Sequence, residues 1–309
     1  MFCLFTLPVS GRAQQAKKFE AFFKRLEKTR QFSGSVLVAD HGKEIYRGAF
    51  GYADFNSGQR NQVNTAFPIA SMSKTITATA ILQLAEQGKL SVSDPVARYL
   101  PGFPYAAVTV WHLLSHTSGL PPYNAFFKSL LAAAPARIVT NADFLPAAIA
   151  NKPAIIYQPG DSGNYDNVNY LILALLIERV SGERYPDYIR DHILKPSGMT
   201  HTRFMALSNQ FNTDTLRNYA FPYLYPAMFD AVPVRSNSIP YVRDYWRTFA
   251  VTGFGDYIST VDDMLLYDQA LYDGRLLKAG TLKTAFQIVK LNNGQPHPQL
   301  FGLGWEIEQ

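Results

Sequence analysis

Cysteine is almost absent from this sequence of 309 residues: Cys3 is the only one, so no disulfide can form within the chain. Most of the chain also carries no net charge. Residues 11–30 carry seven basic and two acidic side chains, which accounts for the whole net charge of +5. The remainder is electrically neutral, and one basic helix is usually a solvated surface, so no nucleic-acid partner is expected.

Long apolar runs are lacking as well. After the first ten residues, no stretch approaches the ~20 consecutive apolar residues of a membrane span, so no integral membrane segment is expected. The apolar first ten residues resemble the end of a secretory signal peptide cut near Ala13, and an unattached apolar N-terminus is the alternative. A residual signal over residues 1–15 predicts a periplasmic or secreted protein.

Motifs of other hydrolase classes are also absent. The chain contains neither the G-x-S-x-G of α/β-hydrolases nor the H-E-x-x-H of zinc proteases. These absences argue against an α/β-hydrolase and a zinc protease, and we expect no metal and no cofactor. A hydrophobic fraction of 47% and an aromatic fraction of 14% indicate a globular protein with a substantial core.

Local patterns predict strands near both ends of the chain and helices between them. Two β-rich runs, 35–39 and 44–48, flank an Asp-x-Gly turn and predict a hairpin. Strands around a helical middle predict an α/β (α+β) fold, in which an antiparallel sheet flanked by helices is assembled from both chain ends, with an α-helical insertion. Helices are expected at 19–26, 71–87, 110–115, 142–150, 167–180, 185–194 and 262–272, and a late strand at 301–307.

The predicted domain organisation follows this order of elements. Residues 16–80 and 251–309 are expected to form the α/β sheet domain, and residues 81–250 a mostly helical domain. Within the latter, residues 206–250 show no clean period and are rich in Tyr, Phe, Pro and Arg. We expect the aromatic part, 221–249, to rim the cleft, with ordinary surface packing as the alternative.

Ser71-Met72-Ser73-Lys74 is an S-x-x-K motif at the start of a predicted helix. Residues three apart lie on one helix face, about 4.5 Å apart along the axis, so Ser71 and Lys74 can meet. A serine hydroxyl needs a base to take its proton, and a lysine with a pKa lowered by burial can be that base. The motif predicts Ser71 as a nucleophile, whereas an N-cap serine beside an exposed lysine is the alternative.

Tyr165-Asp166-Asn167 is a Y-x-N motif just before a long apolar helix. A phenol beside an ammonium group can share its proton, so Tyr165 can relay a proton between Ser71 and a leaving group. The Asn167 amide can hold a substrate carbonyl or position Lys74. A partly buried tyrosine followed by an Asn N-cap is the alternative.

Order and spacing together give the chain a family resemblance from about Phe32 onward. It resembles the serine β-lactamase and penicillin-binding-protein superfamily, in particular the branch with class C β-lactamases, D-Ala-D-Ala carboxypeptidases and related esterases. The markers are Phe-Pro-Ile-Ala-Ser-Met-Ser-Lys at 67–74, His-Leu-Leu-Ser-His-Thr-Ser-Gly-Leu at 112–120, Tyr-Asp-Asn-Val-Asn-Tyr at 165–170, Tyr-Ile-Ser-Thr-Val-Asp-Asp-Met at 257–264 and Phe-Gly-Leu-Gly-Trp at 301–305.

The resemblance implies that Ser71 is acylated, with Lys74 and Tyr165 as acid–base partners. It implies hydrolysis of an amide, ester or β-lactam without a metal, on a small-molecule or peptidoglycan-like substrate. His112 and His116 lie in a segment that is structural in the family, so we expect hydrogen-bonded core histidines. The motifs do not distinguish lactamase, carboxypeptidase and esterase, and they leave the oligomeric state open.

One family motif is not found. The third motif, Lys-Thr-Gly or His-x-Gly, belongs on a strand after residues 301–305, and it supplies an oxyanion-hole amide in the family. Lys283-Thr284-Ala285 lacks the glycine and lies in a predicted helix. We therefore expect either a fragment that lacks C-terminal strands, or a non-catalytic penicillin-binding-like pseudoenzyme that retains Ser71.

Overall fold

The computed structural model of the chain describes residues 9–205, 218–225 and 233–308. Residues 1–8 of the expected signal remnant lie outside this part, and residues 9–15 form the first turns of helix α1 (Val9–Lys28). Strands β1 (Gly34–Asp40) and β2 (Lys43–Phe50) form the expected hairpin, with Asp40 opposite Lys43. Its two-residue turn, His41 and Gly42, has φ values of +50° and +70°, as the favoured hairpin turns require.

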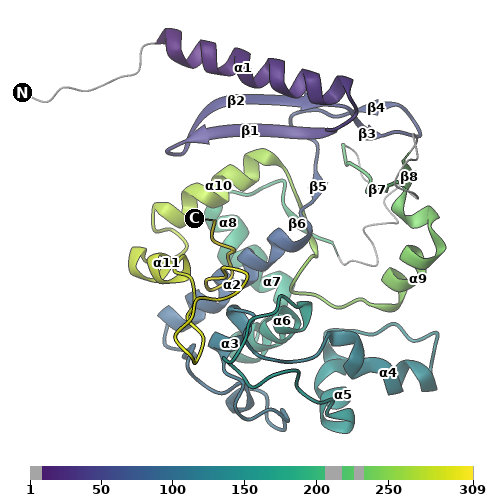
Figure 1. The fold of residues 1–309 in the computed structure, drawn as a ribbon, viewed down its shortest axis with the longest axis vertical. Coiled ribbons are helices and arrows are strands. Elements are labelled where there is room, and N and C mark those ends of the chain that lie inside the picture. The colour runs from purple at the N-terminus through teal and green to yellow at the C-terminus, as the bar shows by residue number, and fades with distance from the viewer. Residues whose placement is uncertain (1–8, 206–217, 226–232, 309) are drawn as a thin grey trace, which may run out of the picture.

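Helix α1 lies along one side of this hairpin and helix α10 (Val261–Tyr272) on the other (Figure 1). The ring of Tyr46 stacks against Phe19 and Phe23 of α1, and its hydroxyl donates to Glu20 at 2.7 Å. Phe22, next to Phe23 in the same apolar run, is 46% exposed. The apolar spacing therefore predicted the helix correctly, although its buried stripe is narrower than expected.

The strands of the described residues form small antiparallel sheets. In the three-stranded sheet the central strand is β9 (Tyr257–Ser259), whose Ser259 pairs with Phe67 from early in the chain. The early and late parts of the chain therefore meet in one sheet, as expected. The α/β class is confirmed, with small sheets among the described residues instead of one continuous sheet. The remaining strand pairs are β3 (Tyr52–Asp54) with β4 (Gln59–Arg60), β5 (Phe67–Pro68) and β6 (Arg203–Phe204) with β9 (Tyr257–Ser259), and β7 (Tyr223–Leu224) with β8 (Val234–Arg235).

The core lies around two helices, α2 and α6, which pack against each other and are buried along most of their length. Because both helices are apolar on nearly all sides, neighbouring helices cover them (Figure 1). The helices beyond α1 and α10 are α2 (Ser73–Glu86), α3 (Val110–Leu114), α4 (Tyr123–Ala133), α5 (Phe144–Asn151), α6 (Asn167–Ser181), α7 (Tyr185–Ile189), α8 (Lys195–Ser197), α9 (Pro240–Thr248) and α11 (Ala279–Ala285).

Capping residues set the helix ends as the sequence predicts. The Thr109 side chain accepts the His112 N–H at the start of α3, and Thr140 forms a capping box with Asp143 before α5. Gly182 ends α6 in the left-handed conformation, with a φ of +77°. The N-cap of α6 is Asp166 and not Asn167, because the Asp166 carboxylate accepts the Val168 N–H at 2.9 Å.

Two expected elements differ from the structure. Residues 301–307 form no strand: Phe301 and Glu306 make one isolated bridge across a tight turn in which Gly304 has a φ of +109°. The alternating apolar pattern there reflects burial against neighbouring helices and not sheet pairing. The helix expected at 185–194 divides into α7 and a π-helical turn, Arg190–Leu194, which leads directly into α8.

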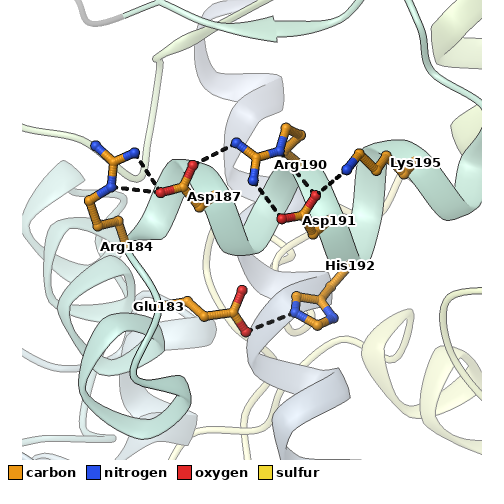
Figure 2. Close-up of polar contacts among 7 residues, drawn as sticks. All are labelled: Glu183, Arg184, Asp187, Arg190, Asp191, His192 and Lys195. Carbon is orange, nitrogen blue, oxygen red and sulfur yellow. Dashed lines mark hydrogen bonds and ion pairs between the residues drawn. The ribbon is translucent and has the colours of Figure 1, made fainter.

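The surface of α7 and this π-helical turn carries a chain of ion pairs, drawn in Figure 2. Asp187 bridges Arg184 and Arg190, each at 2.6 Å, and Asp191 bridges Arg190 and Lys195. The Arg190 guanidinium lowers the pKa of Asp191 most strongly. Because the pairs are solvated, we assign them a small share of stability and no catalytic role.

The expected division into a sheet domain (16–80 and 251–309) and a helical domain (81–250) stays a prediction. Among the helices that the structure describes, none combines the length and apolar character needed to cross a bilayer.

Candidate active site

Ser71 lies at the entrance of α2, in a short 3-10 turn (Ala70–Met72) that runs directly into the helix. Ala70 has a φ of +44°, so the chain bends sharply just before the serine. The Ser71 side chain is therefore exposed at the positive end of the helix dipole. Lys74, one turn later, is only 3% exposed.

The structure brings together the three residues expected to move a proton. The Lys74 Nζ lies 3.1 Å from the Ser71 Oγ, and the Tyr165 hydroxyl donates to the same Oγ at 2.6 Å. Ser71 and Lys74 share one helix face, as the i, i+3 spacing predicts, and Tyr165 arrives from the loop before α6. The hydroxyl of Ser71 is thus in contact with two groups that can accept or donate a proton.

Lys74 occupies a largely aromatic site. Its Nζ donates to the Phe254 carbonyl at 3.0 Å and lies 4.7 Å from the ring centroid of Tyr165, with the rings of Tyr170 and Phe254 within 5.8 Å. Burial lowers the pKa of Lys74 to about 7, although Asp256 and Asp166 act in the opposite direction. The neutral form of the Lys74 amine, which can accept a proton, is therefore accessible near neutral pH.

Tyr165 is held from behind by residues of two other segments. Its backbone N–H donates to the Gln299 side chain at 2.8 Å, and its ring stacks on Phe301 at 5.7 Å and contacts the His116 ring at 4.7 Å. Burial raises the pKa of Tyr165. The Tyr165 phenol is therefore protonated near neutral pH, and it donates its hydrogen bond to the Ser71 Oγ.

His116 is a hydrogen-bonded core histidine, 1% exposed, as expected. Its Nδ1 accepts from the Asp166 N–H at 3.3 Å and lies 3.1 Å from the Asn169 amide nitrogen, while Ser118 donates to the Asn169 oxygen at 2.6 Å. Burial lowers the pKa of His116 well below its usual range, so the ring is neutral. This network orients the loop that carries Tyr165. His112 instead completes the cap of α3 with Thr109.

Asn167 lies outside the hydrogen bonds that link Ser71, Lys74 and Tyr165. It lines a hollow of about 240 Å³ with Tyr123, Asn124, Tyr165 and others, and among the hydrogen bonds of the described residues none links it to Ser71 or Lys74. Its expected contact with a substrate carbonyl stays a prediction. The suggestion that it positions Lys74 receives no hydrogen bond in support.

A larger hollow of about 750 Å³ reaches Ala70, the residue before Ser71. Its lining includes Phe221 and Tyr223 from the aromatic segment that we expected at the rim. Phe249, at the other end of that segment, is buried against Tyr123. Tyr225 and Pro233 of the same segment also line the hollow, whereas residues 226–232 lie outside the described part.

A family model described as Beta-lactamase matches residues 19–309. The chain belongs to the beta-lactamase family. No group of His, Cys, Asp and Glu side chains suited to a metal ion occurs in the part of the chain that the structure describes.

Relatives in sequence and in structure agree on this beta-lactamase family. A penicillin-binding protein of Bacillus subtilis (strain 168) is 32% identical over 302 residues, which cover 96% of this chain and 64% of the relative. The protein PbpX of the same organism is 33% identical over 285 residues, covering 89% and 66%. The crystal structure of a penicillin-binding protein from Bacillus halodurans superposes with a TM-score of 0.71 at 27% identity, covering 91% and 81%. The chain thus spans about two thirds of the curated relatives' length.

Sequence reasoning missed the backbone turn of the candidate active site that binds the Lys74 amine. The turn Gly253-Phe254-Gly255-Asp256 supplies the carbonyl that accepts from Lys74, and Thr77 of α2 donates to the Gly253 carbonyl at 2.8 Å. A Gly-x-Gly-Asp sequence is a turn signal. Nothing in that signal, however, shows which side chain the turn will face.

Gly253 is the position in this turn where a substitution should be most damaging. Its φ is +111°, and a Cβ there would lie 2.3 Å from the Tyr170 carbonyl oxygen of α6, an atom that cannot move aside. We expect Gly253→Ala to lower the free energy of unfolding by at least about 2 kcal/mol more than Gly88→Ala. Gly88 is the matched control, because its φ is +69° and a Cβ there would meet nothing within 4 Å. Equal urea denaturation midpoints for the two variants would contradict this expectation.

Proposed function

We propose that the protein is an acyl-serine hydrolase that acts on amide, ester or β-lactam substrates. Ser71 is the nucleophile, Lys74 the base that receives its proton, and Tyr165 the group that delivers a proton to the leaving group. One observation carries the proposal: the Ser71 Oγ is 3.1 Å from an amine whose pKa is about 7 and 2.6 Å from the hydroxyl of a protonated tyrosine.

The chemistry follows from these contacts. The lone pair of neutral Lys74 accepts the Ser71 proton as the Oγ attacks the substrate carbonyl carbon. The bond between that carbon and the leaving nitrogen or oxygen then breaks, and Tyr165 gives its proton to the leaving group. The Lys74 ammonium, directly above the Tyr165 ring, returns a proton to the phenolate. Water then attacks the acyl-enzyme and regenerates Ser71 by the same groups in reverse.

The proposed substrate class rests on the family and on the shape of the site. Asn167, with its amide beside Tyr165, is the group that we propose to bind a substrate carbonyl. The relatives are named for penicillin binding, which supports peptidoglycan-like or β-lactam substrates for this chain and a periplasmic or secreted location. No cofactor is required by any of these steps.

Covalent labelling tests the proposal directly. The purified protein would be incubated with a fluorescent penicillin and, separately, with a fluorophosphonate, and the adducts mapped by mass spectrometry. We expect an adduct on the peptide that contains Ser71, with mass equal to the probe acyl or phosphonyl group. Turnover of nitrocefin, a p-nitrophenyl ester and a D-alanyl-D-alanine peptide would then separate lactamase, esterase and carboxypeptidase.

The same experiment separates this proposal from the non-catalytic alternative. A protein that only binds penicillin would shift in thermal melting with the ligand but carry no covalent adduct. Failure of both probes to label Ser71 in a folded protein would refute the acyl-serine mechanism.

A further inference from the structure

Asp256 lies at the back of the site, completely buried, and its two carboxylate oxygens are in very different surroundings. One oxygen, Oδ1, accepts the backbone N–H groups of residues 253, 254 and 255 at 2.9, 3.0 and 2.9 Å. The other, Oδ2, is buried and has no hydrogen-bond partner among the described residues. The first oxygen holds the turn together, and the second does nothing for that turn.

A buried acceptor without a partner is costly, so it requires an explanation. Holding the turn needs only one acceptor oxygen, which an asparagine would also supply. A carboxylate differs from an asparagine amide by its negative charge. That charge can act on the buried amine of Lys74, which the same turn binds. Phe254, two residues before Asp256, presents its carbonyl to Lys74 at 3.0 Å.

The charges around this pair come from several elements. Lys74 interacts with Asp256 and with the half-buried Asp166, and its own charge helps to keep His116 neutral. Asp256 also faces two fully buried phenols, Tyr185 of α7 and Tyr257 of β9, whose pKa values are raised, chiefly by burial. Lys74 is the one cation among these groups, so a negative charge on Asp256 acts mainly on Lys74.

We propose that Asp256 is a positioning residue for Lys74: it fixes the turn whose carbonyl anchors the amine, and its charge sets the pH at which that amine becomes a base. The inference rests on the proposed function of Lys74. Burial lowers the pKa of Lys74, and the negative charges of Asp256 and then Asp166 oppose this lowering. Without that charge, Lys74 would lose its proton at lower pH.

The decisive variant is Asp256→Asn, which keeps an acceptor for the three N–H groups and removes the charge. The Lys74 side chain would be followed by NMR in protein labelled with ¹³C at the lysine ε-carbons, with the resonance assigned through Lys74→Arg. We expect the Lys74 titration midpoint to fall by on the order of one pH unit in Asp256→Asn. The acid limb of the penicillin acylation rate should move to lower pH by the same amount.

Asp263→Asn is the matched control. Asp263 is also buried and anchors backbone, accepting from the His201 N–H at 2.8 Å and from Thr202 at 2.7 Å, but it has no part in the site. Its replacement should leave the Lys74 midpoint unchanged. An unchanged midpoint in a folded Asp256→Asn protein would overturn the proposal, since a purely structural aspartate would cost stability alone.

The wild-type protein gives a second measurement if Asp256→Asn does not fold. Burial raises the pKa of Asp256 to about 6, close to that of Lys74, so the two groups should titrate together and broaden the Lys74 titration curve. A Lys74 curve that fits one independent proton would contradict the proposed coupling. The NMR result does not depend on turnover, so a shifted Lys74 midpoint in a protein that no probe labels would refute the proposed function and leave this inference standing.

Discussion

Replacing Ser71 with alanine is expected to abolish covalent labelling by fluorescent penicillin and to lower acylation by on the order of 10⁴–10⁶-fold. The Ser71 Oγ is the atom on which Lys74 and Tyr165 converge, and no other hydroxyl of the described site is bonded to both. Because Ser71 is exposed, its loss should leave the free energy of unfolding nearly unchanged. The measurement is the second-order rate of labelling, followed by in-gel fluorescence.

Ser73→Ala is the control for this prediction. Ser73 lies two residues further along the same segment, but its hydroxyl is completely buried and has no hydrogen-bond partner among the described residues. Its removal should not slow labelling and should not destabilise the fold, because a buried hydroxyl without a partner contributes no hydrogen bond. Labelling that persists in Ser71→Ala, or that is lost in Ser73→Ala instead, would show that the nucleophile has been assigned wrongly.

Replacing Lys74 with alanine is expected to slow acylation by on the order of 10²–10⁴-fold and to remove its pH dependence near neutrality. In the wild type the active form of Lys74 is the neutral amine, so the rate should rise with pH and reach half its plateau near pH 7, the pKa of this group. Without the amine this limb should disappear. Stopped-flow acylation between pH 5 and pH 9 would measure both effects.

The exposed Lys89, just after the end of α2, provides the control. Lys89→Ala removes the same charge from the protein without touching the site, so its pH–rate profile should coincide with that of the wild type. An acid limb that survives in Lys74→Ala at the same midpoint would assign the titration to a group other than this lysine.

The sequence was sufficient to predict the contact between the two site residues that are close in the chain, Ser71 and Lys74. Ser71 and Lys74 are three residues apart on one helix, so helical periodicity and elementary acid–base chemistry predicted their meeting. Tyr165 could be connected to them only through the family resemblance, because its position 94 residues away follows from no local pattern. Helix ends were predictable for the same reason as Ser71 and Lys74: caps such as Thr109 and Gly182 act within one turn.

The non-local half was not predictable. The Phe254 carbonyl is a backbone atom, which has no sequence signature, and Asp256 has meaning only once the turn is folded against α2. Residues 301–307 were wrongly expected as a strand because their apolar residues alternate, whereas the turn at Gly304 packs against Ala78 of α2. Alternation reports burial on one side and does not by itself specify a pairing partner.

The separation of these groups along the chain also has a consequence for biosynthesis. The Phe254 carbonyl follows Lys74 by 180 residues, so at ordinary elongation rates the ribosome needs roughly 10–40 s to add it after the nucleophile. Throughout that interval the nascent chain contains Ser71 and Lys74 but lacks the Phe254 carbonyl that binds the Lys74 amine. Reactivity should therefore arise only late in synthesis, when closure of this long loop is opposed by chain entropy and favoured by packing of α2 against α6. If Ser71 is acylated as we propose, a newly made chain should stay unreactive toward acylating substrates until its core has formed.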